Sequence, residues 1–424
     1  MSSEYDMPEG MLGIALAFEG IRDCVTIING PMGCKSYPAW FSEHSFPCRD
    51  KESYTNEPLK YYKRFFFTQP RVPCTYMDSD DYIMGVREKL DEAFEEVIAT
   101  KPGMIGMINS PGASLIGETL GVNSERGIIV KVDSPAPSVP IGTGFQDTMI
   151  KILQTISPRK EEKRDGVNLI GISIWDLDWA DSLEDLKSLL AICGIKVNTV
   201  VGAGCCVSEL ENSGKAELNV IIRREFGINI AKWYEMELNV PYVESKYGAP
   251  IGFDALEDWV SCICAKLNKD PSEAMKKIKE QRERVANILL ALYTVHKPTV
   301  GHTFSVVAGG SLAYPITKFL YEYLGIFPVA VSTGIDRSFD SEFAEFAEEI
   351  GIEIPSDVYD TPSDAMIGDG DSIASAMYRG LIPEGYDIVR PGRRIVRIKE
   401  RPVLGLGGTM RLIDGVMNVL RRMD

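Results

Sequence analysis

Hydrophobic and polar positions follow two alternating patterns along most of the chain. Short apolar runs that end in small or polar residues predict buried strands, and apolar residues spaced three or four positions apart predict amphipathic helices. Strands are predicted at residues 24–29, 104–108, 168–174, 197–201, 219–222, 303–307 and 327–332. Helices are predicted at residues 86–99, 183–193 and 410–422.

Strands that alternate with helices of this length predict βαβ units, and therefore an α/β fold with mainly parallel sheets. A charged stretch at residues 158–165 predicts a linker, and residues 266–284 predict a polar helix. We therefore expect three Rossmann-like domains at residues 1–160, 161–275 and 276–424. Such sheets bind ligands at the carboxyl ends of their strands. The loops of interest are residues 29–35, 109–114, 202–207 and 308–311.

Composition and charge exclude several classes of protein. The 424 residues carry a formal net charge of −16 and no stripe of Lys and Arg, which argues against binding to nucleic acid. No apolar run approaches about 18 residues, so no membrane-spanning helix is expected. Nine Cys and no secretory leader indicate a reducing compartment, and therefore a cytoplasmic protein. The three His, at positions 44, 296 and 302, show no zinc-ligand spacing.

The segment from Gly30 to Cys34 (GPMGC) directly follows a predicted strand. Two Gly and one Pro predict a tight turn whose exposed amides would lower the pKa of the Cys34 thiol and stabilise an anionic cluster. A plain turn with a small buried Cys is the alternative. Because no closely spaced run of Cys is present, the chain does not itself signal four thiolate ligands. A cluster shared between two chains needs only one to three ligands from each.

At this point the sequence resembles nitrogenase component 1 subunits and related nitrogenase-like reductases, and is most similar to a β-type subunit. The resemblance begins with residues 6–19 (DMPEGMLGIALAFE) and 28–35 (INGPMGCK). It continues in order through residues 72–86, 110–118, 137–149, 216–220, 240–242, 249–253, 304–334 and 402–420. It therefore spans nearly the whole chain and implies the nitrogenase component 1 fold, with a C-terminal helix that closes the third domain.

In this family the Cys of the Gly-rich turn ligates an interfacial iron–sulfur cluster, a role that the resemblance assigns to Cys34, with Gly30 and Gly33 in the same cluster-binding turn. Asp6 stands where the first cluster Cys is usual, and one relative, the dark-operative protochlorophyllide reductase, uses an Asp ligand. Pro111, beside Ser110, stands where another Cys is expected. The candidate metal ligands are therefore Cys34, Asp6 and Cys74. The implied cofactor is a [4Fe-4S] or P-cluster-like cluster shared with a partner subunit.

The resemblance also indicates what the chain lacks. The family's cofactor Cys falls near Arg223 here, and no His follows His302, so no molybdenum cofactor is expected on this chain. Arg223 and Arg224 would meet an anionic substrate or form a surface ion pair. Cys205 and Cys206 would line a cavity or be inert thiols. The run 405–408 (GLGG), which precedes the last predicted helix, would hold an anion or simply make a tight turn.

The leading functional hypothesis is that the chain is a subunit of a nitrogenase-like oxidoreductase. We expect this enzyme to work under anaerobic conditions and to assemble as a heterotetramer. The resemblance implies two partners, a homologous component 1 subunit, whether identical or different, and an ATP-hydrolysing iron protein. Because this chain has no Walker A motif, ATP hydrolysis would belong to the iron protein. The substrate is a small molecule. By analogy, a tetrapyrrole or an organosulfur compound fits better than nitrogen. A non-catalytic scaffold for metallocluster assembly is the alternative, and a cluster-free small-molecule binding protein is the third.

Overall fold

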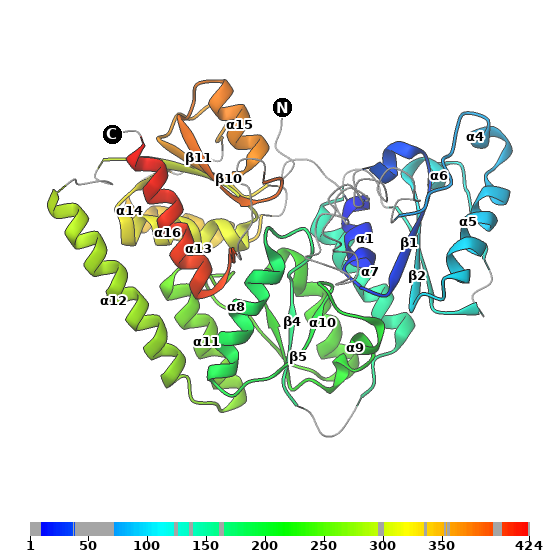
Figure 1. Ribbon diagram of the computed structural model, residues 1–424, viewed down its shortest axis with the longest axis horizontal. Helices are drawn as coiled ribbons and strands as arrows, with labels where there is room; N and C mark the ends of the chain where they lie inside the picture. The colour runs from blue at the N-terminus through cyan, green and yellow to red at the C-terminus, as the bar shows by residue number, and fades with distance from the viewer. Residues whose placement is uncertain are drawn as a thin grey trace, which may run out of the picture.

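The computed structural model describes residues 10–36, 38, 72–122, 126–134, 139–160, 165–295, 301–334, 337–351, 353, 357–392 and 401–422. In Figure 1 three sheets flanked by helices follow one another along the chain, so the predicted α/β fold is confirmed. The strand orders are β1-β2-β3, β5-β4-β6-β7 and β11-β10-β8-β9. Every pairing between these strands is parallel.

The strands are β1 Cys24–Asn29, β2 Met104–Asn109, β3 Ile129–Asp133, β4 Val167–Ile170, β5 Val197–Val201, β6 Leu218–Ile221, β7 Tyr242–Val243, β8 Thr303–Val307, β9 Phe327–Ser332, β10 Ala365–Asp369 and β11 Glu384–Val389. The α-helices are α1 Gly10–Glu19, α4 Asp81–Met84, α5 Arg87–Ala99, α6 Pro111–Leu115, α7 Ile141–Ile156, α8 Trp179–Ile192, α9 Val207–Glu211, α10 Arg224–Leu238, α11 Phe253–Leu267, α12 Ser272–Val295, α13 Gly310–Leu324, α14 Asp340–Ile350, α15 Gly370–Tyr378 and α16 Gly405–Arg421.

Several element boundaries differ from those predicted. Strand β4 stops at Ile170 rather than residue 174, because Gly171 has a φ of 89°, which β structure does not accommodate. The polar stretch 266–284 is not one helix, since α11 ends where Asn268 adopts a left-handed conformation and α12 begins at Ser272. The run 405–408 does not precede the last helix but forms the first turn of α16.

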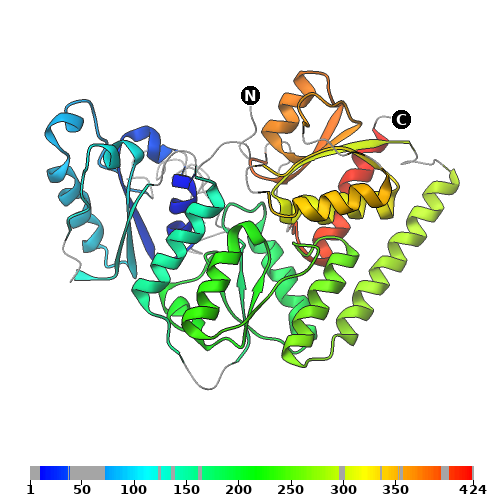
Figure 2. The same ribbon diagram turned by 180° about the vertical axis from the view of Figure 1, so that it is seen from behind.

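Helices cover both faces of the first sheet, which explains why its strands are apolar without alternation. Ile27 of β1 packs in a cluster with Leu90 and Phe94 of α5. The next residue, Ile28, faces the opposite way and belongs to the larger core that includes Phe145 of α7. Figures 1 and 2 show α1 and α7 together on this second face.

Glycines let α1 and α7 cross with their backbones in contact. A Cβ on Gly13 would lie 2.0 Å from the carbonyl oxygen of Ile141, and one on Gly144 would lie 2.2 Å from that of Gly10. No side chain fits in either position. The crossing ties the chain segment before β1 to the helix that leads into the second sheet.

The three predicted domains stay a prediction, although each sheet lies within one of the proposed ranges. One continuous hydrophobic core includes Ile28, Leu169 and Phe304, one residue from each sheet. Packing alone therefore does not separate the units. Among the described residues, no helix has the length and apolar character needed to cross a bilayer.

Candidate functional site

Three segments meet at the carboxyl end of the first sheet. Residues 73–77 run parallel to the end of β1, where the amide of Thr75 donates to the carbonyl of Ile28 at 3.1 Å and that of Met77 donates to Gly30 at 3.0 Å. Ser110 follows β2, and its amide donates to the carbonyl of Asn29 at 2.9 Å. The loop after β1 is thereby joined both to the loop after β2 and to residues 73–77, which lie about 45 positions later in the sequence.

A network of side chains fixes these segments to one another. The Thr75 hydroxyl donates to Asn29 Oδ1 at 2.9 Å and accepts from the amide of Gly30 at 3.0 Å. Asn29 Nδ2 donates to Asn109 Oδ1 at 2.9 Å, and Asn109 Nδ2 donates to Asp133 Oδ1 at 2.8 Å. Because such buried amides are costly to leave unpaired, the network holds the ends of all three strands in one arrangement.

Cys34 and Cys74 come together at this site. The Cys74 thiol is buried and lies 3.0 Å from the carbonyl oxygen of Gly30, whereas Cys34 is partly exposed. Burial raises the pKa of Cys34, the nearby Cys74 raises it further, and a hydrogen bond with Ser110 lowers it. Burial likewise raises the pKa of Cys74, against the backbone of Tyr76 and the charge of Lys35. The site thus gathers two thiols from distant segments.

The Gly-rich turn has a different form from the one predicted. Residues 32–36 are helical, so Cys34 lies in a helical turn and not at the end of a tight loop. Gly30 is required by packing, since its Cβ would lie 2.5 Å from Ser110 Oγ. A Cβ on Gly33 would meet nothing within 4 Å. A cluster-binding role for either glycine stays a prediction.

Segments at this end of the first sheet carry exposed hydrophobic side chains. Tyr82 of α4 packs against α6, where a Cβ on Gly112 would lie 2.5 Å from its hydroxyl oxygen. Large hydrophobic side chains on these short helices and on residues 32 and 76 are exposed, and Ile83, Met84 and Leu115 are more than 80% exposed. This apolar rim consists of Met32, Tyr76, Ile83, Met84, Leu115 and Ile116.

The remaining proposed ligand, Asp6, lies outside the described residues, as does Cys48. Within the described part of the chain, no group of three or more His, Cys, Asp or Glu side chains is placed to hold a metal ion. Two thiols are therefore an incomplete ligand set. Thiolates are the usual ligands of iron–sulfur clusters, which take four, so the donors present fit a cluster that other residues complete.

Arg223 is not at the surface, which corrects the expectation of a surface ion pair or a substrate contact. It is 1% exposed and lies between two buried carboxylates, Asp176 and Glu225. Its Nη2 is 2.7 Å from Glu225 Oε1. Gly309 packs directly on this group, since its Cβ would lie 2.4 Å from the same oxygen. The position that the resemblance assigns to the family's cofactor Cys is thus filled by a buried ion pair.

Arg224 forms the partly exposed ion pair that was expected for these residues. Its Nε and Nη2 donate to the two oxygens of Glu244, each at 2.9 Å. The guanidinium also lies 4.8 Å from the ring centroid of Phe339. With its donors engaged in a two-pronged pair, Arg224 is a structural contact rather than a free anion site.

Two further candidates are explained by packing. Cys205 lines a hollow of about 380 Å³ beside β5, and burial raises its pKa to about 12, which describes an unreactive thiol. The helix start at Gly405 already holds an anion from the protein itself. Asp185 Oδ2 accepts from the amide of Gly407 at 2.9 Å, so the chain supplies its own carboxylate there.

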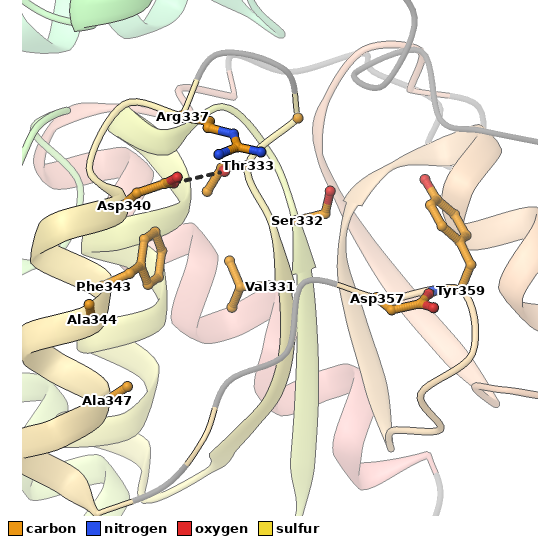
Figure 3. Close-up of a pocket in the computed structure, with 11 residues that line it drawn as sticks. Val331, Ser332, Thr333, Arg337, Asp340, Phe343, Ala344, Ala347, Asp357 and Tyr359 are labelled. Atoms are coloured by element: carbon orange, nitrogen blue, oxygen red, sulfur yellow. Dashed lines mark hydrogen bonds between the residues drawn. The ribbon is translucent and has the colours of Figure 1, made fainter.

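A polar pocket of about 490 Å³ lies at the carboxyl end of β9 (Figure 3). Arg337, Thr333 and Asp340 lie at one end of it, and Asp357 and Tyr359 lie on the opposite side. No thiol or imidazole of the described residues lines it, so it offers none of the soft donors that hold iron–sulfur clusters. The two thiols of the first sheet remain the candidate metal centre.

Comparison with known proteins identifies the family of this chain. The family model for nitrogenase component 1 type oxidoreductases matches residues 10–421. The chain belongs to this family. The resemblance found in the sequence is therefore confirmed, and it extends over all three sheets.

Relatives within the nitrogenase component 1 family differ in what they do. The chain is 23% identical over 403 residues to the nitrogenase iron-molybdenum cofactor biosynthesis protein NifE of Clostridium pasteurianum, covering 92% of this chain and 78% of NifE. It is 20% identical over 462 residues to the nitrogenase molybdenum-iron protein beta chain of Methanococcus maripaludis, covering 96% and 92%. The light-independent protochlorophyllide reductase of a Synechococcus strain has one subunit that is 29% identical, over 46% of this chain and 38% of its own length.

A solved structure confirms the predicted fold. "Nitrogenase Cp1 at pH 6.5" superposes with a TM-score of 0.72 at 16% sequence identity, covering 97% of this chain and 92% of that one. The arrangement of three sheets is therefore the nitrogenase component 1 fold. At this level of identity, the superposition is evidence for a shared fold only.

Proposed function

We propose that this chain is a subunit of a nitrogenase-like oxidoreductase. It receives electrons from an ATP-hydrolysing iron protein through an interfacial iron–sulfur cluster and supports the multi-electron reduction of a small molecule. The observation that carries the proposal is the convergence of Cys34 and Cys74 at the carboxyl end of the first sheet. Two thiols without a complete ligand set suit a cluster that a homologous subunit completes.

We assign each residue a role that this geometry supports. Cys34 and Cys74 would hold the cluster, which when bound supplies one-electron storage and transfer. Asn29, Thr75 and Asn109 keep the two thiol-bearing segments in register. The apolar rim would pack against the partner subunit and exclude water from the thiols, since an interface core is apolar and dry.

A non-catalytic scaffold is the second candidate. The similarity to NifE, a cofactor biosynthesis protein by name, extends over 92% of the chain and favours this alternative specifically. Both candidates need the same thiols. They differ in turnover, because a scaffold binds a metallocluster without reducing a substrate.

Anaerobic purification with the cognate partner tests the proposal. We expect a brown protein whose visible absorbance is bleached by dithionite, and substrate reduction that requires both ATP and the iron protein. Bleaching without such turnover would favour the scaffold. A colourless protein without iron, after anaerobic reconstitution with iron and sulfide, would contradict both candidates.

Asp6 is proposed as a third ligand, an oxygen donor in place of a thiolate. Asp6→Ala is expected to lower cluster occupancy, because one ligand is lost. Asp6→Cys should retain the cluster but shift its midpoint potential and slow turnover, since sulfur donates more charge to iron than oxygen does. The measurements are iron content and a redox titration, with Glu4→Ala as the matched control. A wild-type potential in Asp6→Cys would end the assignment.

A further inference from the structure

Lys35 is a buried cation beside the two thiols. Its side chain is 4% exposed although it follows Cys34 directly. Its Nζ donates to the Tyr76 hydroxyl at 2.7 Å and lies 4.8 Å from the centroid of that ring. Across the described residues, no carboxylate forms an ion pair with Lys35.

A buried ammonium without a counter-ion is unusual. Removing the charge from water costs several kcal/mol unless a carboxylate or several acceptors compensate for it. The Tyr76 hydroxyl is neutral and accepts from one of the three N–H bonds. Arg223, a buried cation elsewhere in the chain, has two carboxylates beside it. None of the described neighbours of Lys35 therefore supplies a negative charge that balances its ammonium group.

The charge of Lys35 lies next to the place where a cluster would bind. Lys35 directly follows Cys34 in the chain and is 4% exposed. Its partner Tyr76 is two residues from Cys74, and the Tyr76 amide donates to the Cys74 sulfur at 3.4 Å. Lys35 and Tyr76 thus connect the segments that carry the two thiols.

We infer that Lys35 is the built-in counter-ion of the anionic cluster held by Cys34 and Cys74, and that it raises the reduction potential of that cluster. The inference rests on the proposed function. An iron–sulfur cluster with thiolate ligands is anionic, and reduction adds one further negative charge. A fixed positive charge in a low-dielectric site stabilises the reduced form more than the oxidised form.

Three substitutions separate charge from shape. Lys35→Met retains the length of the side chain without its charge, and Lys35→Arg retains the charge. Tyr76→Phe removes the hydrogen bond but leaves both the ring and the ammonium.

In a redox titration of the purified complex, Lys35→Met is expected to lower the ratio of reduced to oxidised cluster about tenfold at the wild-type midpoint. For a one-electron couple this corresponds to about 59 mV. Lys35→Arg and Tyr76→Phe should shift the ratio less than about threefold, since the charge that acts on the cluster is retained in both.

Iron content and circular dichroism accompany each titration. If Lys35→Met folds but loses iron while Lys35→Arg retains it, the charge is needed to hold the cluster, which supports the inference. A wild-type potential in Lys35→Met would overturn it, as would equal loss of iron in the Met and Arg variants. If the wild-type complex holds a cluster that Cys34→Ala removes, either of these results refutes only the role of Lys35. Absence of iron from the wild-type complex would instead refute the proposed function.

Discussion

Replacing Cys34 by alanine is expected to remove most of the iron from the complex. The thiol would be a direct ligand in a site with only two thiols from the described part of this chain, so its loss leaves the cluster with too few donors. Because disturbing even an outer-shell partner of a metal costs 10–100-fold in affinity, we expect losing a ligand to lower iron affinity by roughly 100-fold or more. Iron analysis and the visible spectrum of the anaerobically purified complex provide the measurement.

Cys206→Ala is the matched control, because Cys206 is also a partly exposed thiol but lies beside Ser208 in the second sheet's loop. It should leave the iron content unchanged. Cys74→Ala is expected to resemble Cys34→Ala, since the two thiols share one site. Wild-type iron content and spectrum in Cys34→Ala would show that Cys34 is not a ligand.

Replacing Arg223 by alanine is expected to lower the free energy of unfolding by about 3–5 kcal/mol. The substitution leaves the carboxylates of Asp176 and Glu225 buried without their cation. Within the described residues, Oε2 of Glu225 already has no hydrogen-bond partner. The negative charges of the two carboxylates are therefore balanced by the guanidinium of Arg223. Denaturant unfolding followed by circular dichroism measures the change.

Arg224→Ala serves as the control for position and charge. Arg224 is 38% exposed and pairs with Glu244, so solvent screens its ion pair. We expect a loss of about 1 kcal/mol or less, as for other exposed pairs. Similar losses in both variants would contradict the assignment of Arg223 as a buried structural cation.

The local pattern of the sequence was sufficient to predict several elements. The strands β1, β5, β8 and β9 begin and end at the predicted residues, because each is a short, mostly apolar run that ends in buried residues and is followed by a small or polar residue. Strand β10 (Ala365–Asp369) was not predicted. It ends in a buried Asp whose oxygens accept hydrogen bonds from the first turn of α15, which makes a charged residue compatible with burial.

The candidate site was predictable only in part. Cys34 and Cys74 were both proposed as ligands from the sequence, Cys34 from its Gly-rich segment and the family resemblance. Lys35 and Ser110 were not proposed as functional residues, and a Lys directly after the candidate Cys was the only available signal. The role of Asp6 stays a prediction, because that residue lies outside the described part of the chain.

By itself, the sequence determined the fold class and the order of many strands, because hydrophobic periodicity and turn residues act over a few positions. The tertiary structure alone decided which distant groups share an environment. Lys35 meets Tyr76 across 41 positions, and Arg223 meets Asp176 across 47. Burial and charge compensation depend on such non-local contacts. For this reason two buried basic residues differ in role. Arg223 is neutralised by carboxylates of the same chain, whereas Lys35, by our inference, is neutralised by the bound cluster.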